Sequence, residues 1–274
     1  MRLLLFGKNG QLGWELHREL ATLGDVRAVD YPESDFTDAD RVREYVRSAL
    51  PQVIVNAAAY TDVDRAESEP EIAMAVNAAA PGILAEESAA IGAAFIHFST
   101  DYVFDGTKGA PYIEDDPPHP LNIYGESKLA GEAAVRQAGG TFLIIRTSFV
   151  YSLRGDCFVT RVLKWAREKQ TLRIVTDQVS NPTWCRMLAE AIARLLAAGG
   201  NDTVHWLRER NGIYHLAGDG FASRFDWAQE ILRVDPHCRE QIVERLEPAL
   251  TAEFPTQAKR PLFSALDCAR FHNT

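Results

Sequence analysis

A glycine-rich turn close to the start of the chain constrains the fold more than any other feature. Gly7, Gly10 and Gly13 recur at every third residue, between the apolar run 2–6 and the helical pattern 14–23. A short, unbroken apolar run is typical of a parallel strand that is buried on both faces. Glycines at this spacing permit a tight turn and close helix–strand packing, and the helix then presents free N–H groups to a pyrophosphate. The turn therefore predicts a dinucleotide site at the end of the first strand.

The chain continues as an alternation of strand-like and helix-like segments. Further apolar runs of strand length lie at 25–29, 52–56 and 94–98, with helical patterns between them. This alternation is typical of a parallel sheet with right-handed crossovers and helices on both faces. The length of 274 residues suits one large domain or two unequal lobes. We expect an α/β fold, with a Rossmann-type doubly wound parallel sheet in residues 1–150. Residues 151–274 should form mostly a smaller C-terminal substrate-binding lobe and return some elements to the sheet.

The remaining segments are assigned from the same patterns. The apolar runs 142–146, 172–176 and 212–216 predict strands, and helices are expected at 39–50, 71–92, 184–198 and 224–234. His215 lies inside one of these strands, where a core histidine is a more economical interpretation than a ligand.

Several strand ends carry residues suited to a nucleotide. Asp30 follows the second strand, where a carboxylate accepts hydrogen bonds from adenosine ribose hydroxyls and repels a 2′-phosphate. It therefore favours NADH over NADPH without deciding between them. The small residues 57–59 follow the third strand and leave room for a ligand across the backbone. Asp35 and Phe36 are placed to flank an adenine, whereas Asp38 suits a helix cap at least as well.

A tyrosine and a lysine four residues apart provide candidate proton chemistry. Tyr124 and Lys128 project from one face of a helix, although such a pair alone is most often an ordinary exposed one. A free tyrosine keeps its proton to about pH 10, and we expect the lysine charge to lower the pKa of Tyr124. Thr100 follows the strand 94–98 and can hydrogen-bond a carbonyl. With a dinucleotide site upstream, these residues form an acid group for hydride addition to a carbonyl, and Lys128 is also expected to hold the nicotinamide ribose.

Seven segments spread over nearly the whole chain carry a family resemblance: GKNGQLGWEL, NAAAYTDVDRAESEP, STDYVFDG, PLNIYGESKLAGE, RTSFVY, DQVSNPT and RPLFSALD. Together they make the chain similar to the dTDP-4-dehydrorhamnose reductase family of the extended short-chain dehydrogenase/reductase superfamily. The resemblance implies NADPH- or NADH-dependent reduction of the C4 ketone of dTDP-4-dehydro-L-rhamnose to dTDP-L-rhamnose, in L-rhamnose biosynthesis. The implied partner is a small-molecule dTDP-sugar.

The resemblance also implies a role for individual residues. Thr100, Tyr124 and Lys128 match the catalytic triad of the family. The expected cofactor-binding residues are Gly7, Asn9, Gly10, Gln11, Leu12, Asp30, Asp35, Phe36, Ala57, Ala58, Ala59, Tyr60, Thr61, Tyr124 and Lys128. The expected substrate-binding residues are Thr100, Asp101, Val103, Tyr124, Phe149 and Arg260.

The residues after Thr100 distinguish among related reactions. Nucleotide-sugar dehydratases of the superfamily carry an Asp-Glu pair there, because elimination of water needs an acid and a base. This chain has Asp101 and Tyr102, and a reduction needs only one proton donor. The pair therefore favours a reductase, while another nucleotide-sugar reductase or an epimerase remains the alternative. A non-catalytic regulatory subunit of the same fold, as found in methionine adenosyltransferase complexes, is the alternative from another class, and the intact catalytic residues argue against it.

Two positions depart from the family or have two interpretations. Related reductases usually have Trp where this chain has Phe149, which keeps the apolar face for the sugar and loses the indole donor. Arg260, which precedes Pro261, can place its guanidinium on the nucleotide pyrophosphate or be a surface arginine before a turn. Both interpretations of Arg260 are equally open from the sequence.

The charge balance and the cysteines exclude several classes of partner. The chain has 29 Lys and Arg against 38 Asp and Glu, a net charge of −9, without a basic run. This argues against nucleic acid or an anionic membrane as the main partner. No apolar run has the length of a membrane span or signal peptide, and the four scattered cysteines lack ligand spacing. We expect a cytoplasmic protein with reduced thiols.

A magnesium-bridged dimer is not expected. Some bacterial relatives dimerise around Mg²⁺ held by surface glutamates, and Glu15 matches one of them. Arg186 places a cation where a further ligand should be, and the chain stops at Thr274, before the loop and helix with which relatives usually continue. Because Mg²⁺ needs several oxygen ligands, no metal is expected, and the protein should be a monomer or a homodimer formed through other contacts.

Overall fold

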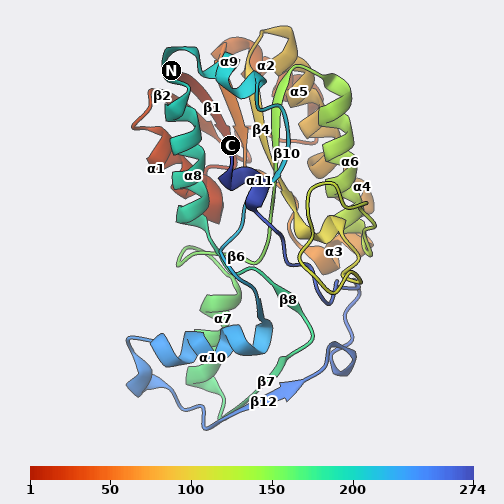
Figure 1. Ribbon diagram of the computed structural model, residues 1–274, viewed down its shortest axis with the longest axis vertical. Helices are drawn as coiled ribbons and strands as arrows, with labels where there is room; N and C mark the ends of the chain where they lie inside the picture. Colours follow the sequence, from red (N-terminus) through yellow and green to blue (C-terminus); the bar gives the residue numbers. More distant parts are fainter.

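The larger part of the molecule is one parallel sheet covered by helices, with a smaller lobe below it (Figure 1). A computed structural model describes residues 1–274. The six strands lie in the order β2, β1, β3, β4, β5, β10, and all pair in parallel. Their bounds are β1 (Arg2–Phe6), β2 (Asp25–Val29), β3 (Val53–Asn56), β4 (Ala94–Thr100), β5 (Thr141–Thr147) and β10 (Gly212–His215).

Alternate side chains of each strand pack against helices on opposite faces of the sheet. Leu3 and Leu5 face α1 (Gln11–Leu20), α8 (Cys185–Ala198) and α9 (Thr203–Arg208). Leu4 and Phe6 face the other layer, which consists of α2 (Ala39–Ala49), α5 (Ala80–Ala90) and α6 (Ile123–Ala138). The strand order reverses between β1 and β3, which opens a crevice at their carboxyl ends. The expected doubly wound Rossmann-type fold is therefore confirmed.

The helix expected over residues 71–92 is interrupted by a π-helical turn. Two short helices, α3 (Val63–Ser68) and α4 (Pro70–Met74), lead into this turn at Ala75–Ala79, and α5 follows it. The turn brings its backbone against α6 at Gly131, where an added Cβ would lie 2.1 Å from the Asn77 carbonyl oxygen. Only glycine allows this contact, which fixes the helix that carries Tyr124 and Lys128.

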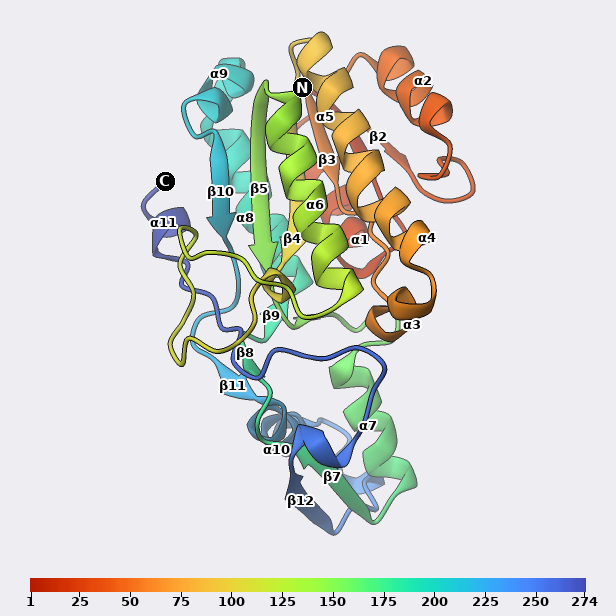
Figure 2. The same cartoon turned by 90° about the vertical axis from the view of Figure 1, so that its right-hand side faces the viewer.

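The smaller lobe contains two helices and short strands around a separate apolar cluster. α7 (Phe158–Glu168) and α10 (Arg224–Val234) pack on β7 (Thr171–Val175), which pairs with β12 (Arg245–Ala249). Two more strand pairs lie where the lobe meets the sheet, and Figure 2 labels β8, β9 and β11 there. They are β6 (Val150–Tyr151) with β9 (Thr183–Trp184), and β8 (Val179–Ser180) with β11 (Ala222–Ser223).

The second half of the chain is divided between the two regions. β10, α8 and α9 pack with the main sheet, and the last helix is α11 (Ala269–His272). Four 3₁₀ turns complete the structure, at Asp101–Val103, Gly200–Asp202, Cys238–Glu240 and Thr251–Glu253. His215 is fully buried in β10, which confirms it as a core histidine. No helix combines the length and apolar character needed to span a membrane.

Candidate active site

A cleft of about 770 Å³ follows the carboxyl ends of the strands. The glycine turn forms its floor. Gly7 has a φ of +87°, and an added Cβ would lie 2.6 Å from the Ala58 nitrogen. A Cβ at Gly13 would lie 1.8 Å from the Gly7 carbonyl oxygen, so the turn and α1 meet only because both positions are glycine. Gly10 caps α1 without a side chain, which leaves the first N–H groups of the helix facing the cleft. This arrangement fits a dinucleotide pyrophosphate.

The cleft continues past β2 to the place expected for adenosine. Asp30 accepts hydrogen bonds from the backbone nitrogens of Asn9 and Tyr31, at 2.8 Å each, and its carboxylate is thereby held at the rim. Phe36 lines the cleft and packs on the Phe6 ring at 5.4 Å. Asp35 accepts hydrogen bonds from the hydroxyl and the backbone N–H of Thr37, and these bonds lower the pKa of its carboxyl. Asp30, Asp35 and Phe36 all line this part of the cleft.

The segment after β3 lines the middle of the cleft with small residues. Ala57, Ala58, Ala59 and Thr61 contribute to its wall, whereas the Tyr60 ring turns away and donates its hydroxyl to Glu69 at 2.8 Å. The backbone of Tyr60 is clamped by Asn77 of the π-helical turn, which accepts its N–H and donates to its carbonyl. Tyr60 therefore shapes the wall through its backbone.

Thr100, Tyr124 and Lys128 all line this cleft, as expected. Asn122 caps α6 by accepting the Gly125 N–H at 2.8 Å, and this fixes the first turn, which carries Tyr124. The Thr100 hydroxyl at the end of β4 accepts the Tyr102 N–H at 3.2 Å. The three side chains thus come from two elements that meet at one end of the sheet.

The protonation of the pair differs from the expectation that Lys128 lowers the pKa of Tyr124. Burial raises the pKa of Tyr124 above its ordinary value, although the Thr100 hydroxyl opposes this shift. The Lys128 side-chain nitrogen instead donates to the Phe98 carbonyl oxygen at 2.7 Å and lies 3.4 Å from Nε2 of His97. Burial also lowers the pKa of Lys128 to about 8. The expected lowering is wrong for this structure, because Lys128 is directed at the sheet and both groups are desolvated.

Asp101 is a buried carboxylate held by the hydroxyls of its neighbour Thr100 and of two distant serines. It accepts hydrogen bonds from Ser264 at 2.5 Å, from Ser180 at 3.1 Å and from Thr100 at 3.2 Å. Burial raises the pKa of Asp101 to about 6, and the three hydroxyls oppose that shift. The main effect of Asp101 in the cleft is therefore to orient the Thr100 hydroxyl.

Val103 is placed differently from the expectation. Its side chain is fully buried and packs in an apolar cluster with Phe104, Tyr112 and Leu266. It lines neither large cavity, because the 3₁₀ turn after β4 directs it into the core. This corrects the assignment of its side chain to substrate binding.

Phe149 lines the cleft in an aromatic stack that the sequence did not indicate. Its φ of +40° is unusual for a residue with a side chain. The ring stacks on Trp227 with centroids 5.7 Å apart, and the Arg224 guanidinium lies 3.7 Å from its centroid. Phe158 lies 4.7 Å from the same guanidinium. Arg224 begins α10, and no carboxylate pairs with it.

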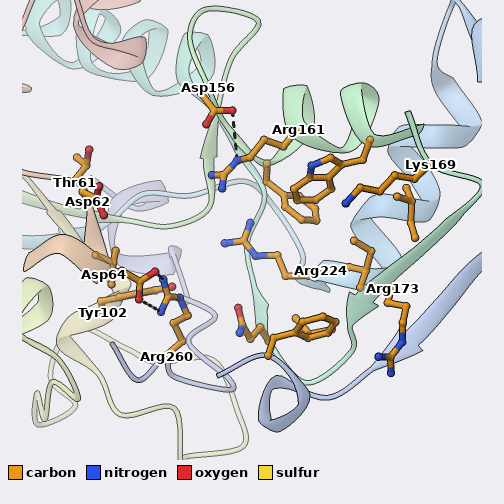
Figure 3. A pocket seen from close by; sticks show the side chains of 18 of the residues that line it. Thr61, Asp62, Asp64, Tyr102, Asp156, Arg161, Lys169, Arg173, Arg224 and Arg260 are labelled. Atoms are coloured by element: carbon orange, nitrogen blue, oxygen red, sulfur yellow. Dashed lines mark hydrogen bonds and ion pairs between the residues drawn. The ribbon is translucent and has the colours of Figure 1, made fainter. Parts of the chain in front are cut away.

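A second cavity of about 890 Å³ adjoins the cleft and is lined by five basic residues (Figure 3). These are Arg161, Lys169, Arg173, Arg224 and Arg260. Of these five, only Arg260 was expected at the site from the sequence; it pairs with Asp64 of α3 at 2.6 Å and lowers the pKa of that carboxyl. The guanidinium is thus neither free nor an ordinary surface group. It is part of the cavity wall.

The other basic residues were missed because they come from separate elements. Arg161 and Lys169 belong to or follow α7, Arg173 lies in β7, and Arg224 begins α10. None forms a run in the sequence. The one local signal was the alternation in 171–175, which places Arg173 on the face opposite Leu172 and Ile174.

Of the two residues considered for a metal bridge, Arg186 is exposed and Glu15 is half-buried. Arg186, in the first turn of α8, pairs with Glu190 at 2.9 Å and lies over the Trp184 ring. Glu15 lies on α1, the helix that packs against α8.

Comparison with known proteins gives one consistent result. Residues 1–274 match the family model of the RmlD substrate binding domain. A dTDP-4-dehydrorhamnose reductase of Burkholderia thailandensis is 42% identical over 275 residues, which cover 97% of this chain and 90% of that protein. The enzyme of the same name from Escherichia coli is 40% identical, over 99% of this chain and 91% of that protein.

Comparison with solved structures gives relatives of the same name. A dTDP-4-dehydrorhamnose reductase from Bacillus anthracis, in complex with NADP, has a TM-score of 0.87 at 34% identity and covers 97% of this chain and 90% of its own. UDP-glucose 4-epimerase from Thermus thermophilus, in complex with NAD, has a TM-score of 0.77 at 19% identity, covering 100% of this chain and 92% of its own. At that identity the second likeness concerns the fold alone.

Proposed function

The chain belongs to the RmlD substrate-binding-domain family, and on that premise we propose that it reduces the C4 ketone of dTDP-4-dehydro-L-rhamnose, giving dTDP-L-rhamnose. The cofactor is a nicotinamide dinucleotide, and the relative crystallised with NADP supports NADPH. The glycine turn and the small residues 57–59 leave space for it along the cleft.

The observation that carries the proposal at the level of the site is the continuity of the two cavities. The catalytic cleft and the basic cavity share wall residues, so a single ligand can occupy both. The shared residues are Thr61, Val63, Tyr102, Asp156, Phe158, Arg161 and Arg224. A nucleotide-sugar has this distribution of groups: a neutral ketosugar to reduce and a diphosphate that needs cationic partners.

We assign the diphosphate to the cations at this junction. The Arg224 guanidinium lies in the space between Arg161 and Arg260 (Figure 3). Burial lowers the pKa of Arg224, and the charges of the other two lower it further. Arg161 and Arg260 each pair with a carboxylate, whereas Arg224 touches only aromatic faces and has hydrogen-bond donors to spare. Arg224 is therefore our candidate for the phosphate next to the sugar.

The chain's own residues supply the proton and the orientation. Because burial raises the pKa of Tyr124, its phenol stays protonated at neutral pH and enters the reaction as an acid. When bound, the nicotinamide supplies the hydride for C4 of the sugar. The C=O π electrons then move to the oxygen, which takes the Tyr124 proton, while the Thr100 hydroxyl turns its one hydrogen from Asp101 to this oxygen and fixes its position. Lys128 is assigned to the nicotinamide ribose.

The proposal includes the domain organisation, the substrate, the location in the cell and the oligomeric state. We assign residues 1–150 to the dinucleotide-binding domain and residues 151–274 mostly to the substrate lobe, with β10, α8 and α9 belonging to the sheet. The substrate is a small-molecule dTDP-sugar, and we place the enzyme in the cytoplasm, as a monomer or a homodimer without a bridging metal.

The test is a reduction assay with the purified chain. Consumption of NADPH and of NADH is followed with dTDP-4-dehydro-L-rhamnose and with the UDP-linked 4-ketosugars, and the product is identified by NMR. We expect turnover with the dTDP-sugar and formation of the L-rhamnose configuration. Faster turnover of another ketosugar, or a C4 epimer as product, would assign a different nucleotide-sugar reaction. Dinucleotide binding without any turnover would favour a regulatory subunit.

A further inference from the structure

A chain of buried polar groups links the wall of the cofactor cleft to Lys128. The Ala58 N–H donates to Oδ1 of Asn56 at 3.1 Å, and Nδ2 of Asn56 lies 3.1 Å from Nδ1 of His97. Nε2 of His97 lies 3.4 Å from the Lys128 amine, which donates to the Phe98 carbonyl oxygen at 2.7 Å. Asn56 and His97 are fully buried and Lys128 is 2% exposed, so these groups are shielded from bulk water.

The donor and acceptor roles in this series of hydrogen bonds are fixed by the Ala58 N–H. A backbone N–H can only donate, so the Asn56 oxygen must face Ala58 and the Asn56 NH₂ must face His97. Nδ1 of His97 then accepts, and the ring carries its proton on Nε2. Burial holds the pKa of His97 well below its ordinary value, so the ring is neutral.

The last group of this series of hydrogen bonds, the His97 ring, presents a donor to Lys128. The Nε2–H of His97 points toward the lysine nitrogen, and an ammonium has three N–H groups and no lone pair to accept it. A neutral amine accepts this hydrogen and still donates to the Phe98 carbonyl. Every group in the chain is satisfied only when Lys128 is neutral.

From this geometry we propose that His97 is a positioning residue that weakens proton binding by Lys128, so that Lys128 takes up a proton from solvent when the dinucleotide binds. Ribose hydroxyl oxygens then offer acceptors to the ammonium. The positive charge is thus placed beside Tyr124 for the step in which the phenol gives up its proton. Burial lowers the pKa of Lys128 to about 8, so the amine of the ligand-free protein is mostly neutral above that pH, and the proton uptake is expected there.

Other charged groups near Lys128 do not account for its state. On α6 itself, Tyr124 is neutral, and the Glu132 charge raises the pKa of Lys128. Glu132 is engaged by Arg146 of β5 at 2.7 Å and by Ser99 of β4 at 2.6 Å. From β3 and β4, the groups that face Lys128 through the chain are the Asn56 amide and the His97 ring. Only His97 opposes its protonation by direct contact.

The direct test is a measurement on the parent chain, with one variant used only to assign the signal. Nitrogen NMR of the ligand-free chain, selectively labelled at histidine, reports which His97 nitrogen carries the proton. We expect Nε2, with the shift assigned by its loss in His97→Phe. A proton on Nδ1 would overturn the proposal, because Nε2 would then accept from a Lys128 ammonium.

A second test reverses the donor and acceptor roles in this series of hydrogen bonds. In Asn56→Asp a carboxylate accepts both the Ala58 N–H and a proton on Nδ1 of His97, which leaves the Nε2 lone pair facing Lys128. We expect the high-pH limb of the kcat/KM profile to move upward by roughly one pH unit. The same change in a His97→Phe background should leave the limb in place. An equal shift in both backgrounds would show that the added charge acts directly, and no shift in either would remove His97 from the mechanism.

The kinetic readout rests on the proposed reductase function, whereas the NMR readout does not. A chain without turnover but with the proton on Nε2 would contradict the function and leave the His97 proposal standing. Uptake of about one proton on NADPH binding near pH 8.5, measured in two buffers of different ionisation enthalpy, links the two. Absence of that uptake in the parent would contradict the proposal.

Discussion

The catalytic cleft and the basic cavity differ in how their polar groups are held. In the cleft, Asp101 has three hydroxyl partners and Lys128 has a carbonyl and an imidazole. In the basic cavity, Arg224 rests on aromatic rings and Lys169 lies over Trp165 at 5.9 Å, neither with a carboxylate. Groups that carry out chemistry must be fixed before substrate arrives, whereas groups that attract a diphosphate must keep free donors. Substitution of the proton donor Tyr124 should therefore reduce kcat, whereas substitution of Arg224, or of the Phe149 ring on which it lies, should raise KM.

The sharpest way to break this comparison is Tyr124→Phe. The ring and its packing remain, but the proton donor is lost, so kcat should fall by about a thousand-fold with KM nearly unchanged. Steady-state rates of NADPH consumption measure both quantities. Tyr45→Phe, on the outer helix α2, is the matched control and should keep the parent rate. A Tyr124→Phe rate within a few-fold of the parent would show that another group donates the proton.

Asp101→Asn tests the cost of the fixed carboxylate. The pKa of Asp101 is raised to about 6 in the folded protein against 3.8 ordinarily, so the charge opposes folding above that range. Its contribution to stability is greatest below about pH 4 and falls by about 2–3 kcal/mol as the pH rises through 6. Asn cannot ionise, so the stability of the variant relative to the parent should increase over this interval. Urea unfolding of both proteins at several pH values measures the difference, and parallel curves would contradict the assignment.

Arg224→Met should affect binding far more than chemistry. Removing charge-assisted hydrogen bonds to a phosphate costs about 1.5–3 kcal/mol, so KM for the dTDP-sugar should rise roughly 10- to 150-fold while kcat changes little. Competition by dTDP should weaken more than competition by dTMP, because the proposed contact is to the phosphate next to the sugar. Arg136→Met on the exposed side of α6 is the control. Equal losses for dTDP and dTMP would place Arg224 elsewhere along the nucleotide.

Phe149→Ala should produce the smallest effect. It removes the ring on which the Arg224 guanidinium lies, a cation–π contact of about 0.5–1 kcal/mol, so KM should rise about two- to five-fold. In the Arg224→Met background the same change should add little, because the two residues act as a unit. Full additivity in the double variant would separate the ring from the guanidinium and assign Phe149 to the sugar alone.

The sheet and the catalytic residues were predictable because their signals are local. The Gly7–Gly13 turn lies between a strand and a helix, and Tyr124 and Lys128 are one helical turn apart. The basic cavity was not predictable, because it joins side chains from α7, β7 and α10 whose proximity depends on tertiary packing. The pKa shifts of the catalytic residues were also not predictable from the sequence. Spacing brought Lys128 near Tyr124, but burial decided the pKa of each.

Asn122 has a consequence for the time course of folding. It caps the start of α6 and also donates to the Lys259 carbonyl at 2.6 Å, across 137 residues of sequence. A helix such as α6 can form within its own segment, but closing so long a loop is slow and entropically costly. During refolding, the helical signal should therefore recover before enzymatic activity. The residue that begins the catalytic helix also makes its final alignment one of the late events on the folding pathway.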